Sequence, residues 1–295
     1  MLSVRKAVFP VAGFGRRFLP ATKASPKEML PVVDKPLVQY AVEEAVAAGI
    51  TQLIFVTGRG KRVIEDHFDK SYEIEQVLKL QGQQALLDLV QNIKPSHVEC
   101  VYVRQPEPLG LGHALLCAGK LVGKEPFAVV LADDLLVGEP PVLAQMVRVF
   151  SHYDCSVVAV KEFEPEESSA YGVVSGRYWD ERVMSIGKIV EKPAPDAAPS
   201  NIGVAGRYVL MPSIFRHLRA QLPGVNGKLE LSDGIQSMLK DEQVLAYNFD
   251  GTHYNCGTKL GYLKATVDFA LCHPELRGSF DAWLRERICD GNAAR

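Results

Sequence analysis

Short, continuous apolar runs recur along this chain and alternate with longer segments of helical periodicity. Seven runs are dense in Val, Ile, Leu and Phe: Lys6–Val11, Leu53–Thr57, Cys100–Arg104, Phe127–Ala132, Ser156–Val160, Gly203–Leu210 and Leu245–Phe249. A strand that is apolar at nearly every position, rather than at alternate positions, is buried on both faces. The alternation therefore predicts an α/β fold, with a Rossmann-like mixed, mostly parallel sheet covered by helices.

The segments between these runs fit helices that cross over the sheet. Leu37–Ala48 has helical spacing and is followed by Gly49, a residue that commonly ends a helix. His113–Leu121 and Pro141–Ser151 have the same character. The polar stretch 60–97 predicts helices that lie over the surface.

The pattern changes after residue 160. Tyr171–Ser175 and Val183–Glu191 predict a small antiparallel insertion, followed by a proline-rich loop over Lys192–Ser200. Helical periodicity returns near the end of the chain. We expect a main domain of residues 1–258 and a C-terminal helical arm of residues 259–295. The arm either caps the core or packs against another subunit.

Composition and charge exclude several classes of protein. A chain of 295 residues that is 47% hydrophobic can bury a core. Its formal charge of −2 argues against a nucleic-acid binder. No apolar run approaches the roughly 18 residues of a membrane span, and the N-terminus lacks a secretory signal pattern. Six scattered cysteines without a CxxC pair fit reduced thiols, so we expect a cytoplasmic protein without a membrane partner.

A Gly-rich turn follows the first apolar run, and basic residues follow the turn. The segment Ala12-Gly13-Phe14-Gly15 leads into Arg16 and Arg17, and the first 35 residues hold seven Lys/Arg against two acids. Glycines allow a ligand to approach the backbone, whose amides can cradle an anion. Arg and Lys beside such a turn suit a phosphate chain. Neither a P-loop nor a GxGxxG fingerprint matches, so an ordinary turn with a solvated basic face stays an alternative.

A pair of carboxylates follows another buried run. Asp133 and Asp134 come directly after Phe127–Ala132. Ligands of open α/β sheets bind at the carboxyl ends of strands, and Mg²⁺ prefers oxygen ligands. The pair therefore predicts a metal or substrate site, with a turn or helix-capping acid as the alternative.

The segment from Ala12 resembles the signature of the sugar-1-phosphate nucleotidylyltransferases, GxGTRxxPxTxxxPKxxLP. Further matches follow in the family's order across essentially the whole chain: Val56–Gly58, Tyr102–Gln105, Gly110–Ala114, Leu131–Asp134, Tyr171–Val173, Val190–Pro193, Ala198–Asn201, Gly206–Tyr208, Cys256–Gly257 and Gly261–Tyr262. Several motifs in register are far more specific than any one of them.

Within this family the motifs resemble most closely those of bacterial enzymes that make UDP-glucose. The resemblance implies that the phosphate of glucose 1-phosphate attacks the α-phosphorus of UTP, assisted by Mg²⁺, to give UDP-glucose and pyrophosphate. It implies a nucleotide half over about 1–135, a sugar half over about 136–258, and a homodimer or homotetramer.

The resemblance also implies a role for individual residues. Catalytic roles fall on Arg17, Lys27, Asp133 and Lys192. Nucleotide-binding roles fall on Ala12, Gly13, Gly15, Arg16, Glu28, Gln105, Gly110 and Gly112. Sugar-binding roles fall on Asp134, Gly172, Glu191 and Asn201. Asp133 is the implied Mg²⁺ ligand, and position 255, here Asn255, is a second candidate. For His113 and Trp283 we expect packing roles only.

Three positions depart from the family pattern. Arg16 replaces Thr, Lys228 replaces Glu, and Asn255 replaces an acid, so each change makes the expected site more positive. Three hypotheses therefore stay open: an active uridylyltransferase, the same chemistry with dTTP or galactose 1-phosphate, or a weakly catalytic paralogue that binds nucleotide sugars.

Overall fold

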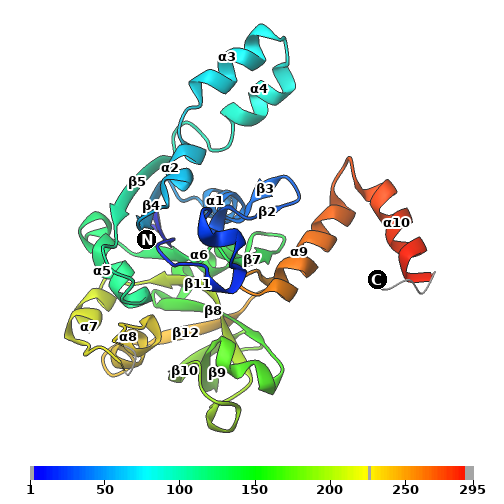
Figure 1. Cartoon of the computed structure of the whole chain (residues 1–295). Coiled ribbons are helices and arrows are strands. Elements are labelled where there is room, and N and C mark those ends of the chain that lie inside the picture. The colour runs from blue at the N-terminus through cyan, green and yellow to red at the C-terminus, as the bar shows by residue number, and fades with distance from the viewer. Residues whose placement is uncertain (1–2, 225–226, 290–295) are drawn as a thin grey trace.

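A computed structural model describes residues 3–224 and 227–289 and contains a central nine-stranded sheet (Figure 1). Its strand order is β5-β4-β1-β6-β11-β8-β12-β10-β9. The strands are β1 (Lys6–Pro10), β4 (Gln52–Thr57), β5 (Glu99–Arg104), β6 (Phe127–Val130), β8 (Ser156–Glu162), β9 (Gly172–Tyr178), β10 (Val183–Glu191), β11 (Ile202–Leu210) and β12 (Val244–Asn248). Each of the seven predicted apolar runs forms a strand, and no strand end differs from its run by more than two residues.

The sheet is mixed, as expected. Strand β1 pairs in parallel with β4 and β6, β4 pairs in parallel with β5, and β8 pairs in parallel with β12. Strand β11 runs antiparallel to both β6 and β8. The predicted antiparallel insertion is the β9–β10 pair, and it extends the edge of the main sheet through β12.

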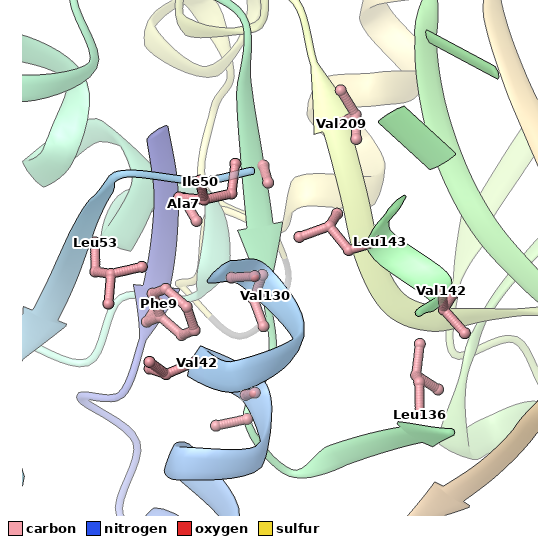
Figure 2. Close-up of a cluster of buried hydrophobic side chains, with 14 of the residues drawn as sticks. Ala7, Phe9, Val42, Ile50, Leu53, Val130, Leu136, Val142, Leu143 and Val209 are labelled. Carbon is pink, nitrogen blue, oxygen red and sulfur yellow. The ribbon is translucent and has the colours of Figure 1, made fainter. Parts of the chain in front are cut away.

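Helices cover both faces of the sheet. The α-helices of the described residues are α1 (Leu37–Ala47), α2 (Arg62–Phe68), α3 (Tyr72–Leu80), α4 (Gln84–Gln91), α5 (Leu111–Val122), α6 (Val142–Tyr153), α7 (Ile214–Ala220), α8 (Leu231–Met238), α9 (Lys259–Cys272) and α10 (Arg277–Cys289), of which α1 and α6 cover one face and α5, α7 and α8 the other. Along β1, Ala7 and Phe9 join the core on the side of α1 and α6, whereas Val8 joins the core on the side of α5, α7 and α8. Figure 2 shows Phe9 of β1 near Val42 of α1 and Val130 of β6. Burial on both faces therefore explains the continuous apolar runs.

Two pairs of helices extend away from the sheet (Figure 1). The α3–α4 hairpin lies within the stretch predicted to form surface helices. Helix α9 contributes Ala265 to a small core with Val32 and Leu37, so it packs against α1 and the segment that precedes α1. Helix α10 packs on α9, and residues 290–295 of the predicted arm lie outside the described residues. No helix of the described chain is long and apolar enough to cross a membrane.

Short strands that the sequence pattern did not predict form two further ladders. Strand β7 (Asp134–Val137) pairs antiparallel with β13 (Thr252–Asn255), and β2 (Pro31–Val32) pairs with β3 (Lys35–Pro36). The β7–β13 register places Asn255 opposite Asp134. This pairing brings two candidate site residues together from distant parts of the sequence.

Candidate functional site

A cavity of about 610 Å³ lies beyond the carboxyl ends of β1 and β6. Most of the residues singled out from the sequence line it: Ala12, Gly13, Gly15, Arg16, Arg17, Lys27, Gln105, Gly110, Asp133, Asp134, Gly172, Glu191, Lys192 and Asn255. Lys228, the third departure from the family pattern, lines it as well. The fold therefore gathers residues from the first turn to the last strand around one space.

Three singled-out residues are not on the cavity wall. Glu28 is buried behind it, and its Oε2 accepts a hydrogen bond from Lys61 Nζ at 2.8 Å. Gly112 donates its backbone N–H to Leu229 O at 2.8 Å, so it fixes the start of α5 against the loop before α8. Asn201 is exposed at the start of β11. Glu28 and Gly112 therefore stabilise segments next to the cavity without lining it.

The Gly-rich turn folds back on the basic segment that follows. Gly15 has φ +63°, and a Cβ there would lie 3.1 Å from Lys27 Cβ. Thr22 Oγ1 donates to Gly15 O at 2.8 Å and closes the turn. A Cβ on Gly13 would meet nothing within 4 Å, so the backbone there is open to a ligand. Glycine at position 15 thus allows the turn and Lys27 to share one wall.

The ammonium of Lys27 donates to Oδ2 of Asp133 in a short charged contact. Burial by itself would raise the pKa of Asp133, but Lys27, and more weakly Arg17, lower it below its usual value. Burial by itself would lower the pKa of Lys27, but Asp133 and Glu28 raise it above its usual value. Both groups are therefore charged at neutral pH, on the wall of the cavity.

The oxygens near Asp133 fit a hard divalent cation. A Cβ on Gly257 would lie 2.8 Å from Asp133 Oδ2 and 3.1 Å from Asn255 Oδ1, so both oxygens face the same small space. Oxygen donors of this kind suit Mg²⁺, which usually takes its other ligands from water and substrate phosphates. Among the described residues, no group of three or more His, Cys, Asp or Glu could hold a metal ion by itself. Substrate oxygens would have to complete the shell.

The far end of the cavity carries a carboxylate held by two donors. Ser232 Oγ donates to Glu191 Oε2 at 2.6 Å, and Lys192 Nζ donates to Glu191 Oε1 at 2.6 Å. Lys192 has a left-handed backbone with φ 44°, and its N–H donates to Tyr171 O at 2.9 Å. A Cβ on Gly172 would lie 3.1 Å from Ser232 Oγ, so glycine leaves room for this contact. Such a carboxylate can accept hydrogen bonds from ligand hydroxyls.

Gln105 lines the cavity and is almost fully buried. Its Nε2 donates to Gly110 O at 3.1 Å and lies 3.0 Å from His113 Nδ1. These contacts fix the amide, whose Oε1 is its acceptor atom. His113 thus supports Gln105 at the start of α5, in line with the packing role expected for it.

Several cavity residues were not assigned a role from the sequence. Ser232, Glu230 and Tyr171 line the wall, and His253 supports it, with Nε2 2.7 Å from Asp134 Oδ1. Burial, and then the Glu191 carboxylate, raise the pKa of Glu230 above its usual value. Glu230 and Ser232 follow Lys228 by two and four residues, so their nearness to a position that departs from the family pattern was the one signal for them. No signal for His253 was available, because its position depends on the β7–β13 pairing.

Comparisons with known proteins agree on one family. The family described as nucleotidyl transferase matches residues 6–271. The UTP–glucose-1-phosphate uridylyltransferase of Pseudomonas aeruginosa is 48% identical over 268 residues, covering 89% of this chain and 95% of the relative. The enzyme of the same name from Bacillus subtilis is 46% identical over 278 residues, covering 94% of each.

Solved structures give the same result. The UDP-glucose pyrophosphorylase of Acinetobacter baumannii superposes with a TM-score of 0.89 at 40% identity, covering 96% of this chain and 99% of that one. A UDP-glucose pyrophosphorylase complexed with UDP-glucose gives a TM-score of 0.82 at 45% identity, covering 90% and 98%. The residues 6–271 matched by the family include every strand of the central sheet and every residue that lines the cavity.

Proposed function

The chain belongs to the nucleotidyl transferase family, and we propose that it makes UDP-glucose and pyrophosphate from UTP and glucose 1-phosphate. The observation that carries this proposal is the order of groups along one cavity. Arg16, Arg17 and Lys27 stand at the Gly-rich turn, Asp133 lies next to them, and the Glu191–Lys192 pair lies at the far end. A triphosphate and a sugar phosphate would meet near Asp133.

The chemistry requires no covalent intermediate with the protein. An oxygen of the sugar phosphate forms a bond to the α-phosphorus of UTP, and the bond from that phosphorus to the bridging oxygen of pyrophosphate breaks. Both reactants are anions, so the protein has to align them and compensate charge. Arg17 and Lys27 would hold the triphosphate and the leaving pyrophosphate, and Lys192 would orient the attacking phosphate.

Asp133 and Asn255 would hold a Mg²⁺ ion together with substrate oxygens. When bound, the ion would neutralise negative charge on the phosphoryl oxygens. Lys27 already neutralises Asp133 in the structure, so its ammonium would turn from the carboxylate to share the incoming phosphates. The proposed reaction therefore uses the Lys27–Asp133 contact as a charge pair that substrate binding reorganises.

Base and sugar would bind at opposite ends of the cavity. Gln105, with the backbone at Ala12, Gly13 and Gly110, would read the edge of the uracil. Glu191, Asp134 and Gly172 would contact the sugar. We therefore keep the division into a nucleotide half over about 1–135 and a sugar half over about 136–258 as a proposal. Glu28, Gly112 and Asn201 would act from outside the cavity wall.

A pyrophosphate-release assay tests the proposal. We expect turnover with UTP and glucose 1-phosphate in the presence of Mg²⁺, and little with dTTP or galactose 1-phosphate. Arg16, Lys228 and Asn255, which depart from the family pattern, all line the cavity. Because they could change which substrate binds, each nucleotide and each sugar phosphate is assayed separately. Binding of UDP-glucose without turnover would identify a non-catalytic paralogue, and a preference for dTTP would change the substrate.

We also propose that the protein is a homodimer or homotetramer and is cytoplasmic, and the exposed apolar residues of α9 and α10 support the assembly. Leu260, Leu263, Trp283 and Ile288 are more than half exposed, whereas Phe280 stacks on Trp283. Apolar surface of this extent is commonly covered by another chain. Light scattering after size-exclusion chromatography measures the assembly, and a monomer at micromolar concentration would refute this part of the proposal.

A further inference from the structure

Strand β11 is irregular where it passes the cavity. Its register with β8 shifts between Val204 and Tyr208, and Gly206 within this stretch has φ +66°. Leu131 N donates to Gly206 O at 3.0 Å, so the irregular stretch meets the end of β6. Irregularities of this kind redirect side chains next to functional sites. The residues that follow Leu131 are Ala132, Asp133 and Asp134.

Glycine at position 206 leaves the space that the Asp134 side chain occupies. A Cβ there would lie 2.2 Å from Asp134 Oδ2 and 2.7 Å from its Cγ, which no real side chain tolerates. The other carboxylate oxygen of Asp134, Oδ1, lies 2.7 Å from His253 Nε2. The Asp134 carboxylate therefore lies between the backbone of β11 at Gly206 and the imidazole on β13.

Arg207, the next residue, contacts the segment Leu131–Asp134 from the face of the sheet that α1 and α6 cover. Its side chain is 0% exposed, and Nη1 donates to Leu131 O at 2.7 Å. Its Nε and Nη2 donate to Glu44 Oε2 at 3.1 and 2.8 Å. Glu44 Oε1 in turn accepts the N–H of Leu143 at 3.0 Å. A buried charge network thus ties this segment to α1 and α6.

We propose that Gly206 and Arg207 are positioning residues that set the direction of the two carboxylates after β6. With both in place, Asp133 faces Lys27 and the phosphate side, while Asp134 faces the sugar side. Reactions of this type are sensitive to misplacement of about 1 Å. The inference rests on the proposed function, since it concerns the alignment of the two substrates.

Gly206→Ala tests the first residue, and Gly82→Ala is its matched control. Both glycines have left-handed backbones, φ +66° and +69°, but a Cβ on Gly82 would meet nothing within 4 Å. Both variants pay a similar backbone cost in stability. We expect Gly206→Ala to lose at least tenfold in kcat/KM for glucose 1-phosphate, and Gly82→Ala to stay within twofold of the wild type.

A spectroscopic measurement follows Asp134 without turnover. In ¹⁵N-labelled protein without substrate, the imidazole signals of His253 report its contact with Asp134, and a His253→Gln sample assigns them. We expect these signals to shift in Gly206→Ala and to stay in place in Gly82→Ala. Unchanged His253 signals together with kinetics equal to the control would overturn the role of Gly206.

The double variant Glu44→Gln/Arg207→Met tests the second residue. It removes the donor to Leu131 O, keeps an acceptor for Leu143 N–H and leaves no unpaired buried charge. We expect a folded protein whose kcat falls at least tenfold. Kinetics within twofold of the wild type would overturn the role of Arg207. If Gly206→Ala does not fold, the double variant alone tests the proposal. Failure of the wild type to turn over would count against the proposed function, whereas the His253 signals would still test the positioning of Asp134.

Discussion

At the scale of single residues, Asp133 carries the strongest prediction. Asp133→Ala removes the carboxylate that both Lys27 and a bound Mg²⁺ would use, so we expect the rate of pyrophosphate release to fall by about a hundredfold or more. The protein should stay folded, which circular dichroism checks. Glu139→Ala, at an acid outside the cavity lining, is the control. Near-normal turnover of Asp133→Ala would show that the reaction does not need the Asp133 carboxylate.

Position 255 tests whether the missing acid limits metal binding. Asn255 Oδ1 faces the same space as Asp133 Oδ2, so a carboxylate there would add a negative charge to the donor set. We expect Asn255→Asp to lower the Mg²⁺ concentration that gives half the maximal rate. Asn92→Asp, at an exposed position on the α3–α4 hairpin, should leave it unchanged. An equal or higher requirement in Asn255→Asp would mean that this position does not sense the metal.

The buried Lys61–Glu28 pair predicts a pH-dependent loss of stability. Burial raises the pKa of Glu28, and Lys27 and then Lys61 oppose that rise. Lys61→Met removes one of the opposing charges and should cost about 3–5 kcal/mol of unfolding free energy. In Lys61→Met the pKa of Glu28 in the folded protein rises further, so above pH 4.5, the usual pKa of Glu, this group binds a proton on folding. The free energy of unfolding therefore falls as the pH rises above that value. The loss should therefore be larger at pH 8 than at pH 5.

Urea unfolding of Lys61→Met at both pH values measures this effect. Lys35→Met is the control, because the Lys35–Glu43 pair is far more exposed than Lys61–Glu28 and should be worth at most about 1 kcal/mol. Glu28→Gln/Lys61→Met removes both charges and should recover most of the stability. Equal losses at pH 5 and pH 8 would contradict the assignment to Glu28.

At the scale of elements, the apolar pattern predicted the strands but not all of their directions. Gly203–Leu210 is as apolar as the parallel strands, yet β11 is antiparallel to both neighbours. The pattern reports burial on both faces, and an antiparallel strand in the middle of a covered sheet is buried in the same way. Strand direction depends on chain connections, which apolar density does not encode.

The short β7–β13 ladder could not be predicted from local pattern. Asp134–Val137 and Thr252–Asn255 have four residues each and are more than one hundred positions apart. Their pairing depends on the packed body of the protein, so the sequence named Asn255 as a candidate only through resemblance, and nothing in the run before Asp134 indicated that the two residues meet. Ser232 and His253 reach Glu191 and Asp134 through the same kind of tertiary contact.

The contact between α8 and β10 gives an element-scale prediction. Ser232 at the start of α8 donates to Glu191 at the end of β10. A hydrogen bond to a charged group is worth about 1.5–3 kcal/mol, so Ser232→Ala should raise the KM for glucose 1-phosphate about tenfold or more. The KM for UTP should change little. Ser185→Ala, on the same strand but outside the cavity lining, is the control, and an equal rise in both KM values would refute a sugar-side role.

At the scale of the whole molecule, the site and the chain carry opposite charge. The cavity wall holds Arg16, Arg17, Lys27, Lys192 and Lys228 against Asp133, Asp134, Glu191 and Glu230, whereas the whole chain has a formal charge of −2. The basic excess of the first 35 residues thus falls partly on one wall of the cavity. A basic cleft on a near-neutral protein attracts anionic substrates over distances that salt shortens.

Arg16 tests whether this excess aids binding. Arg16 is exposed and lines the cavity next to the Gly-rich turn, at a position where the family pattern has Thr. Its side chain forms no salt bridge with an acid of the described residues. Because an arginine so placed is free to meet a triphosphate, we expect Arg16→Thr to raise the KM for UTP by roughly three- to tenfold. The same variant should show a weaker dependence of that KM on NaCl, since one attracting charge is gone. Arg62→Thr, an exposed arginine outside the cavity lining, should change neither quantity. A lower KM for UTP in Arg16→Thr would mean that the arginine obstructs the nucleotide. The positive charge at position 16 would then weaken UTP binding rather than strengthen it.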